Sequence, residues 1–403
     1  MNSRWVPAAL MLVCLAQALS AQNSAPWHDP SPHTVQFVNV DKEVKLEVLD
    51  WRGSGRPLVL LTGLGNSAHV YDDFAPKLTS EYHVYGITRR GFGASSAPAS
   101  GYSADRLGDD VLAVLDALKI EKPVLVGHSI GGEELSSVGS RHPERVAGLI
   151  YLDSAYDQAY YEPSIGNMNI DSQDLQKKLE QLRAASTPQS QKQLIQELLE
   201  KNLPSFERDL REEQMGLSAP WPTPPSATAA ELQNFQSYVL RQKKVFGLDT
   251  PEAELRTFRK ATADGHVGGV INKTKIRQAI MAGGQKYTKI PVPILAIYAI
   301  PHDYGPYVDQ NPAIRDAVAA ATDGWYEKRA KAFEAAFPSA RVVRLAHAHH
   351  YVFMSNETEV LREMRNFLTH STNVPKPIAV FAGSNLEGCF SFPAGFRLLP
   401  GDP

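Results

Sequence analysis

The sequence predicts an α/β fold: a mostly parallel central sheet covered by helices on both faces, with a helical cap inserted into it. Two observations predict this fold. Short apolar runs typical of buried parallel strands recur along the chain and alternate with helical patterns. The alternation stops between residues 156 and 290 and resumes at Val292. A chain of 403 residues is long enough for one such domain with an insertion.

The strands and helices follow from local patterns. Val44, Leu46 and Val48 alternate with Lys45 and Glu47, which predicts an early strand exposed on one face. Buried strands are expected at residues 58–61, 84–87, 124–126, 149–152, 294–298 and 342–345. Ser103 is a good N-cap for a helix that ends near residue 118, and a closing helix is expected over about 357–368.

The segment 156–290 contains helical patterns but no strand-like run, so we predict a helical cap between a first core part, 22–155, and a second, 291–370. It contains the sequence PWPTPP at 220–225, which is too rigid for a helix and is expected to form a turn or a wall of the site. Open α/β sheets bind ligands beyond the carboxyl ends of their strands. The insertion is therefore expected to act as a lid there.

The first residues resemble a secretory signal peptide. Arg4 precedes an apolar run over residues 6–19, and small residues follow it. Gln17 interrupts the run, which is shorter than the roughly 20 residues that a spanning helix needs. We therefore predict cleavage after about residue 21, a secreted or periplasmic protein, and no stable membrane anchor. Cys389 would then be the one remaining cysteine, and no role is predicted for the tail 371–403.

Composition and motifs exclude several classes of function. The formal net charge of −3 provides no basic surface for nucleic acid. The sequence has no Cys/His set with metal-ligand spacing, no P-loop, and no dinucleotide fingerprint after a first strand. We therefore expect no metal and no cofactor, and a small molecule as the partner.

The most specific motif is Gly-His-Ser-Ile-Gly at residues 127–131. It has the form G-x-S-x-G and stands between a predicted strand and a predicted helix, which is the context the motif requires. A serine on so tight a turn needs small residues two positions before and after it, and Gly127 and Gly131 meet that need. The motif predicts that Ser129 is a nucleophile.

With this motif the chain resembles the α/β-hydrolase superfamily over about residues 35–368, as a serine hydrolase with a helical cap. The resemblance implies an oxyanion hole formed by two backbone N–H groups. Ile130, after the nucleophile, is expected to supply one, and Leu64 in the loop Thr-Gly-Leu-Gly-Asn at 62–66 the other. Similar hydrolases often have His-Gly here, whereas this chain has Thr62 before Gly63.

The resemblance also implies a histidine base after the last strand, where the chain has His347, His349 and His350. His350 precedes Tyr351 and has the expected spacing to the closing helix, so it is our first choice. His349, which then occupies the place where a glycine is common, is the main alternative, and His347 comes third.

The third catalytic residue should be a carboxylate at a strand end between nucleophile and histidine. Asp303 follows the strand at 294–298 and is our choice, because the loop after the penultimate strand is the usual source of the acid. Asp153, at the end of the preceding strand, is the alternative.

We therefore expect a serine hydrolase that cleaves a carboxylic ester through an acyl-enzyme. A serine nucleophile disfavours epoxide hydrolases and haloalkane dehalogenases, which use a carboxylate. The enzymatic alternatives are an amidase similar to proline iminopeptidases and a cofactor-free perhydrolase. An alternative of another class is a non-catalytic, ligand-binding homologue.

Overall fold

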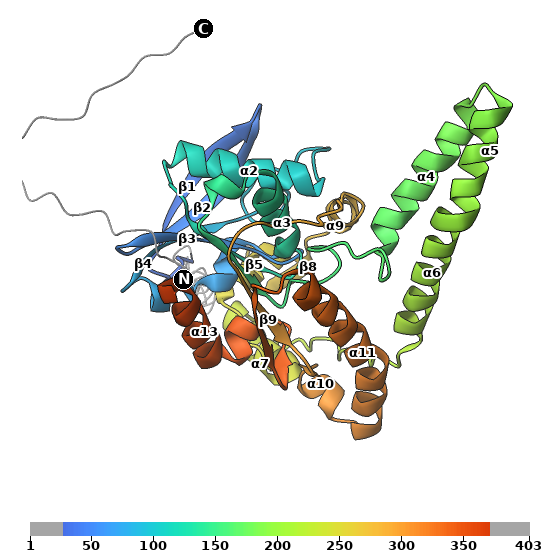
Figure 1. The fold of residues 1–403 in the computed structure, drawn as a ribbon. Coiled ribbons are helices and arrows are strands. Elements are labelled where there is room, and N and C mark those ends of the chain that lie inside the picture. Colours follow the sequence, from blue (N-terminus) through green and yellow to red (C-terminus); the bar gives the residue numbers. More distant parts are fainter. Residues whose placement is uncertain (1–26, 371–403) are drawn as a thin grey trace, which may run out of the picture. The chain divides into compact units, whose positions relative to one another are not determined.

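An eight-stranded sheet forms the centre of the computed structural model, which describes residues 27–370 (Figure 1). Its strand order is β1-β2-β4-β3-β5-β6-β9-β11. The pairs β1–β2 and β2–β4 are antiparallel, and every other neighbouring pair is parallel. The strands are β1 (Thr34–Asp41), β2 (Val44–Arg52), β3 (Arg56–Leu61), β4 (Tyr82–Ile87), β5 (Val124–His128), β6 (Gly148–Leu152), β9 (Ile294–Ala299) and β11 (Arg341–Leu345). The mostly parallel sheet is confirmed.

Helices cover both faces of this sheet, as predicted. Alternate strand residues point to opposite faces and form two apolar cores, one containing Leu60 and Val126 and the other Val59 and Leu125. The first core packs against α12 and α13, and the second against α2, α3 and α11 (Figure 1). These helices, with α10, are α2 (Ala104–Ala117), α3 (Gly131–Arg141), α10 (Pro306–Asp309), α11 (Pro312–Ala336), α12 (Val352–Ser355) and α13 (Glu357–His370).

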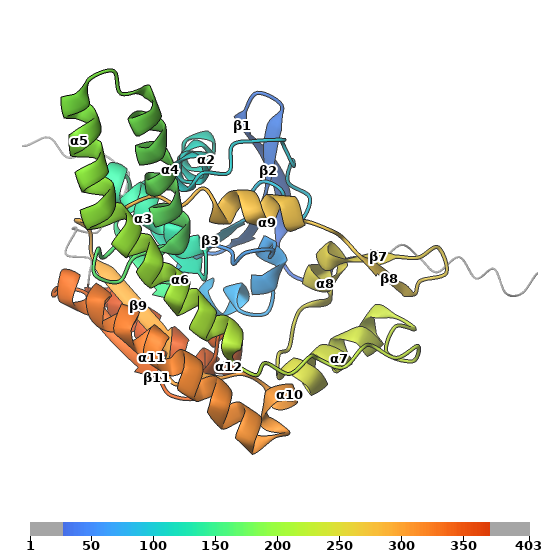
Figure 2. The ribbon, with the colours of Figure 1, turned by 90° about the vertical axis from the view of Figure 1, so that its right-hand side faces the viewer.

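The insertion between β6 and β9 is mainly helical, although it also contains the short hairpin β7–β8 that the sequence analysis did not predict. Helices α4 and α6 pack against each other (Figure 2). An ion pair of Glu212 with Arg329 at 2.8 Å joins α6 to α11. The elements are α4 (Met168–Ala184), α5 (Pro188–Glu197), the π-helical turn η4 (Leu198–Asn202), α6 (Leu203–Ser218), α7 (Phe235–Phe246), α8 (Glu252–Phe258), β7 (Arg259–Ala261), β8 (Val267–Val270) and α9 (Thr274–Met281).

Short elements complete the connections between the strands. The 3₁₀ turns η1 and η2 follow β3, η3 precedes β6, and β10 and β12 form a small parallel pair after β9 and β11. Their bounds are η1 (Ala68–Tyr71), η2 (Ala75–Leu78), η3 (Pro143–Arg145), β10 (His302–Asp303) and β12 (Ala348–His349).

The early strand β2 is more buried than its alternation predicts. Lys45 is exposed, but Glu47 is buried, because its carboxylate accepts a hydrogen bond from the Thr88 hydroxyl at 2.8 Å. The expected exposed face was therefore wrong at Glu47: a hydrogen-bonded carboxylate can be buried where an unpaired one could not.

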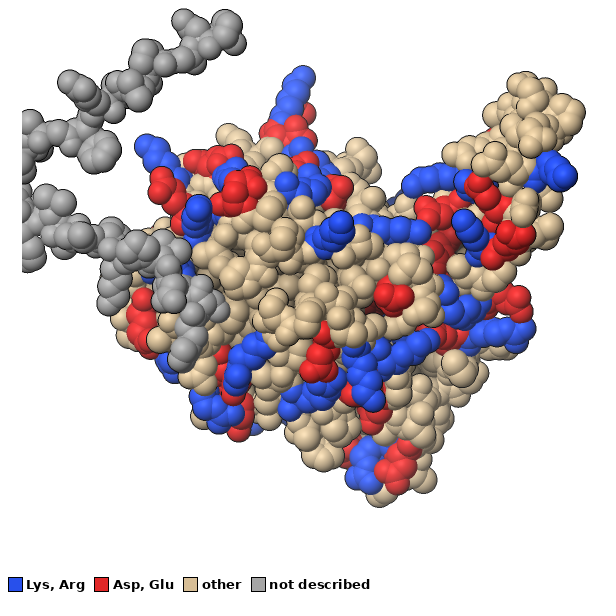
Figure 3. Space-filling model, in the orientation of Figure 1, with Lys and Arg blue, Asp and Glu red and all other residues tan. Residues whose placement is uncertain are grey.

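Charges are mixed on the surface drawn in Figure 3, where Lys and Arg side chains are interspersed with Asp and Glu side chains. Within residues 27–370, no helix combines the length and the apolarity that crossing a membrane requires. The predicted signal peptide (1–21) and the tail 371–403 with Cys389 lie outside the described residues.

Candidate active site

Ser129 stands on a sharp turn between β5 and α3. Its φ is 54°, in the left-handed region that non-glycine residues rarely adopt, and its N–H donates to the Leu152 carbonyl at 3.3 Å. Strained backbone of this kind concentrates at functional sites. The turn has the geometry that the motif predicted for a nucleophile.

The glycines around Ser129 permit this turn because the backbone approaches itself closely there. A methyl group on Gly127 would come within 2.8 Å of the Gly131 carbonyl oxygen, and one on Gly131 within 3.1 Å of the Leu61 carbonyl oxygen. Gly131 therefore also brings the turn close to the end of β3, where the predicted oxyanion loop begins.

His350 lies beside Asp153. Its Nδ1 is 2.6 Å from Asp153 Oδ2, and its side chain is 39% exposed while that of Asp153 is fully buried. With Nδ1–H donated to the carboxylate, Nε2 is the nitrogen left to accept a proton. This is the pairing that a histidine base requires.

The Asp153 carboxylate has four hydrogen-bond donors around it. Oδ1 accepts from the Ala299 N–H at 2.9 Å and from the Tyr156 hydroxyl at 2.5 Å, and Oδ2 accepts from His302 Nε2 at 3.0 Å as well as from His350. Burial by itself raises the pKa of Asp153, but the hydrogen bonds and charges of the two histidines outweigh it and hold the pKa well below its usual value. Asp153 is therefore ionised.

Asp303, which the sequence analysis preferred as the acid, does not contact His350. That choice is corrected here. Asp303 Oδ1 accepts the Gly305 N–H at 2.8 Å, and among the hydrogen bonds and ion pairs of the described residues none joins it to His350. Asp303 pairs instead with His349 in the β10–β12 register. The alternative acid, Asp153, is the residue that contacts the imidazole of His350. Asp153 follows β6, which lies beside β5, the strand that precedes Ser129.

Among the hydrogen bonds and ion pairs of the described residues, none joins either of the other two histidines after β11 to Asp153. His349 Nδ1 accepts the Tyr351 N–H at 3.2 Å, and burial lowers the pKa of His349 to about 4. His347 has a φ of 58° and donates its N–H to the Pro301 carbonyl at 2.8 Å. Of the three candidates, His350 is the one that contacts the buried carboxylate.

The two predicted oxyanion donors lie in loops that pack together. The side chains of Leu64 and Ile130 belong to one apolar cluster, which also contains Ile276 and Ile280 of α9. Within the described part of the chain, neither Leu64 N–H nor Ile130 N–H donates a hydrogen bond to another backbone group. Both are free to donate to a substrate oxygen.

Arg89 braces the loop at 62–66, where this chain departs from His-Gly. Its guanidinium donates to the Thr62 carbonyl at 2.7 Å and to the Gly63 carbonyl at 3.2 Å, and Nε contacts Glu134 of α3 at 2.5 Å. Arg89 thus joins the loop to the helix that follows Ser129.

A buried glutamate of the cap contacts the same loop. Glu254 of α8 accepts hydrogen bonds from Asn66 Nδ2 at 2.8 Å and from the backbone and hydroxyl of Ser67. Asn66 in turn accepts the hydroxyl of Tyr351 at 3.2 Å. The sequence analysis missed Glu254, His302 and Tyr156, because their roles depend on contacts between segments far apart in the chain.

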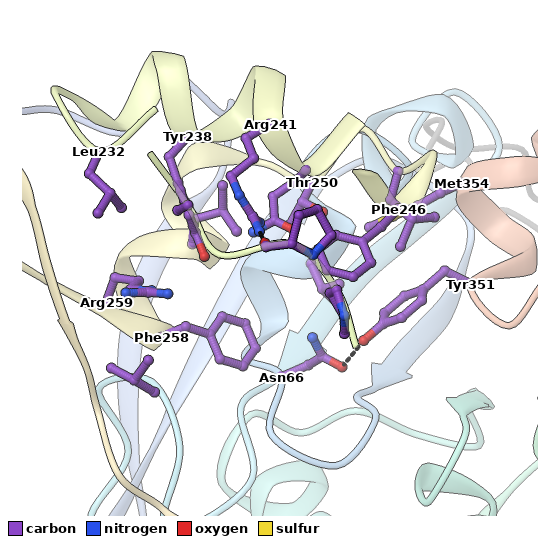
Figure 4. Close-up of a pocket in the computed structure, with 18 of the residues that line it drawn as sticks. Asn66, Leu232, Tyr238, Arg241, Phe246, Thr250, Phe258, Arg259, Tyr351 and Met354 are labelled. Atoms are coloured by element: carbon purple, nitrogen blue, oxygen red, sulfur yellow. Dashed lines mark hydrogen bonds between the residues drawn. The ribbon is translucent and has the colours of Figure 1, made fainter. Parts of the chain in front are cut away.

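A cavity of about 750 Å³ adjoins the site beneath the cap (Figure 4). Asn66 and Tyr351 lie together at one end of it, joined by their hydrogen bond, and Pro224 and Pro225 of the segment 220–225 form part of its wall. Most of the remaining lining is apolar or aromatic, and α7 and α8 contribute part of it, including Phe246 and Phe258. Ser129 and His350 do not line the cavity, which meets the site through Asn66 and through Tyr351, the neighbour of His350.

Ser129 and His350 are not joined by a hydrogen bond between their side chains within the described residues. Such contacts are often long without substrate and shorten in the reacting complex. Ser129, His350, Asp153 and the N–H groups of Leu64 and Ile130 are therefore the candidate residues of a serine hydrolase site.

The model of the alpha/beta hydrolase fold family matches residues 56–357. The match covers most of the chain, including Ser129, His350 and both candidate acids. The chain therefore belongs to the α/β-hydrolase family.

Individual relatives match over shorter stretches. The 2-hydroxymuconate semialdehyde hydrolase of Pseudomonas sp. strain CF600 is 37% identical over 107 residues, which are 26% of this chain and 38% of the relative. The chain spans about two fifths or less of the length of the first curated relatives that it matches.

Solved structures resemble the fold over most of the chain. A crystal structure of E-2-(acetamidomethylene)succinate hydrolase has a TM-score of 0.52 at 15% identity and covers 84% of this chain and 99% of its own. An esterase from Exiguobacterium antarcticum has a TM-score of 0.50 at 16% identity and covers 83% of this chain and 100% of its own. At these identities the likeness concerns the fold alone.

Proposed function

We propose that the protein is a serine hydrolase that cleaves a carboxylic ester, with Ser129 as nucleophile, His350 as base and Asp153 as the carboxylate that orients it. The observation that carries the proposal is the contact of His350 Nδ1 with the buried Asp153 at 2.6 Å, close to a serine with a φ of 54°. Asp153 replaces Asp303 in the set expected from the sequence.

In the proposed mechanism, His350 Nε2 takes the hydroxyl proton of Ser129 while Oγ attacks the ester carbonyl. The N–H groups of Leu64 and Ile130 stabilise the oxyanion of the tetrahedral intermediate. The imidazolium then gives its proton to the departing alcohol, which leaves an acyl-enzyme. Water, deprotonated by His350, attacks this ester, and collapse of the second intermediate releases the acid and returns the proton to Ser129.

The cavity beneath the cap is proposed to receive an apolar part of the substrate. Its volume of about 750 Å³ falls within the range of small-molecule sites, and its lining is mainly apolar and aromatic. Phe258 points into it beside Asn66 (Figure 4), so an alkyl or aryl group there would be close to the oxyanion loop.

The first experiment labels the full chain with a fluorophosphonate, which reacts covalently with an activated serine. We expect labelling of the parent protein and none of Ser129→Ala. Ser136→Ala is the matched control, because Ser136 is a buried serine of α3 whose hydroxyl contacts Tyr151, and it should label as the parent does.

The second experiment separates the reactions open to such a serine. A panel of p-nitrophenyl esters is compared with aminoacyl anilides and with peroxide-dependent oxidation in acetate. Faster turnover of anilides would favour the amidase, and faster peroxidation the perhydrolase. A protein that binds esters without turnover and is not labelled would be the ligand-binding homologue, and the serine-hydrolase proposal would fail.

A further inference from the structure

A second cluster of chemically active side chains lies outside the proposed catalytic site. Asp29 and His33, which precede β1, meet His69 and Asp72 at η1, directly after the oxyanion loop. One potential ligand atom from each residue lies within 4.8 Å of the other three. We propose that these four residues form a structural site for a divalent transition metal, with Zn²⁺ as the best fit.

The distances within the cluster suit such an ion. His69 Nδ1 is 3.0 Å from Asp29 Oδ2 and 2.9 Å from Asp72 Oδ2, and His33 Nδ1 is 3.1 Å from Asp72 Oδ1. Ligands about 2.0–2.1 Å from a tetrahedral zinc are about 3.3 Å apart, so small side-chain adjustments would admit the ion. Two imidazoles and two carboxylates are ligands that zinc accepts, and the two carboxylates balance its charge.

Several of these atoms lack the hydrogen bonds that buried polar atoms normally make. Asp29 Oδ2, His33 Nδ1 and Asp72 Oδ1 are buried without a hydrogen-bond partner, and the side chains of His33 and Asp72 are only 3% and 4% exposed. His33 Nδ1 and Asp72 Oδ1 are close to each other, yet not in hydrogen-bond geometry. Two ligands of one ion are expected to direct their lone pairs to the ion and not to each other. The geometry of His33 Nδ1 and Asp72 Oδ1 agrees with this expectation.

The surroundings of His69 also match a metal ligand. While its Nδ1 faces the two aspartates, its Nε2 is 3.7 Å from Glu47 Oε1. Metal-binding histidines usually present their second ring nitrogen to a carboxylate or carbonyl, which sets the tautomer. Glu47 is itself held by the Thr88 hydroxyl at 2.8 Å. The hydrogen bond from Thr88 accounts for the burial of Glu47 in β2, where the sequence pattern predicted an exposed residue.

The site has four protein ligands, as structural zinc sites do, whereas catalytic zinc keeps a position for water. A bound ion would attach the segment before β1 to η1, and so support the loop that carries Leu64. The sequence analysis expected no metal, because His33 and His69 are 36 positions apart and follow no metal-binding motif.

The test measures zinc directly. The full chain is treated with a chelator, reloaded with ZnCl₂, desalted and analysed for metal by mass spectrometry. We expect one zinc per chain, and a Tm about 5 °C higher than that of the metal-free protein. X-ray absorption at the zinc edge should show nitrogen and oxygen ligands that include two imidazoles. Loss of zinc on desalting, or a sulfur ligand, would overturn the proposal.

Variants locate the ion. His33→Gln and His69→Gln should each weaken zinc binding about 100-fold or more, and Glu47→Gln about 10-fold or more. His83→Gln is the matched control, since His83 also pairs with an aspartate, Asp50 at 2.9 Å, but outside the cluster. Circular dichroism establishes that each variant is folded.

The proposed catalytic residues form another group that could hold a metal, Asp153 with His302 and His350, so the experiment must separate the two sites. His350→Gln should retain the zinc. If His350→Gln loses it while His33→Gln keeps it, the ion belongs to the catalytic residues and the proposed site does not exist.

Discussion

Asp153 is a buried charge made stable by its neighbours. Its carboxylate is fully buried, and four donors from β9, the loop after β6, β10 and the loop after β12 converge on it. A buried carboxylate is costly unless it is paired and hydrogen-bonded, and here both conditions are met. The residue can therefore remain ionised at neutral pH and hold His350 in a single tautomer.

Asp153→Asn tests this role. An asparagine can turn its NH₂ group to the histidines and so favour the wrong tautomer of His350, and we expect kcat for a p-nitrophenyl ester to fall on the order of 10³-fold to 10⁴-fold. Asp303→Asn is the control and should change kcat less than about 3-fold, because its Oδ1 can still accept the Gly305 N–H. The reverse order of losses would restore Asp303 as the acid.

At the scale of elements, the cap and the core meet at α8 and the oxyanion loop. Glu254 is fully buried between them and satisfies three donors of Asn66 and Ser67. The cap thereby takes part in holding the loop that presents Leu64. From the core side, Arg89 holds the same loop through its carbonyl groups.

Glu254→Ala would leave these donors buried without an acceptor, at a cost of about 1–3 kcal/mol for each group that water does not reach. We expect a lower Tm in thermal unfolding and a faster cleavage of the cap by a protease. Glu252→Ala in the same helix breaks only its ion pair with Arg256, worth about 0.5 kcal/mol, and serves as the control. Equal effects of the two substitutions would argue against a buried connection.

The cavity lined by α7 and α8 leads to a prediction about substrate length. Phe258→Ala removes an aromatic wall, and burial of such a side chain contributes about 1.5–3 kcal/mol. We expect KM for p-nitrophenyl hexanoate to rise about 10-fold or more, whereas KM for the acetate, which is too short to reach the cavity, should hardly change. A parallel rise for both esters would place the apolar group of the substrate elsewhere.

At the scale of the whole molecule, α3 contains a buried carboxyl group that does not contribute to the proposed chemistry. Glu133 is buried, its Oε2 has no hydrogen-bond partner, and burial together with the neighbouring Glu134 raises the pKa of Glu133 to about 8. In the unfolded chain the carboxyl ionises near its ordinary value of 4.5. The folded state therefore binds a proton more tightly than the unfolded state does.

Because Glu133 binds its proton more tightly in the folded chain, the protein loses stability as the pH rises. Below pH 4.5 the Glu133 carboxyl is protonated in both the folded and the unfolded chain. As the pH rises from 4.5 toward 8, the unfolded chain releases this proton while the folded chain keeps it, and the free energy of unfolding falls. Glu133→Gln should remove this loss, so that its free energy of unfolding exceeds that of the parent by a few kcal/mol more at pH 8.5 than at pH 4, since one pKa unit corresponds to about 1.4 kcal/mol. Urea unfolding at both pH values measures the difference.

Glu144→Gln is the control for that measurement, because Glu144 is a largely exposed glutamate of η3. Its free energy of unfolding should follow that of the parent at both pH values. If Glu133→Gln also follows the parent, the Glu133 carboxyl is either solvated or paired, and the raised pKa is wrong.

The sequence by itself predicted the parallel strands and the nucleophile turn, and its resemblance to the α/β hydrolases favoured His350. These depend on local patterns: apolar runs, two glycines around Ser129, and the spacing from a histidine to the next helix. The strands at 58–61 and 294–298 lie within β3 and β9 as predicted. Only the tertiary structure shows that Asp153, and not Asp303, contacts His350.

The sequence could not distinguish the two candidate acids, because chain order does not specify which strand end faces the imidazole of His350. In the sheet, β6 lies between β5 and β9, so Asp153 at its end is near both Ser129 and His302. The Glu254 contact joins residues 187 and 188 positions apart, and the proposed metal site joins the segment before β1 to η1. Contacts of this range arise when the sheet assembles, and no local pattern in the sequence encodes them.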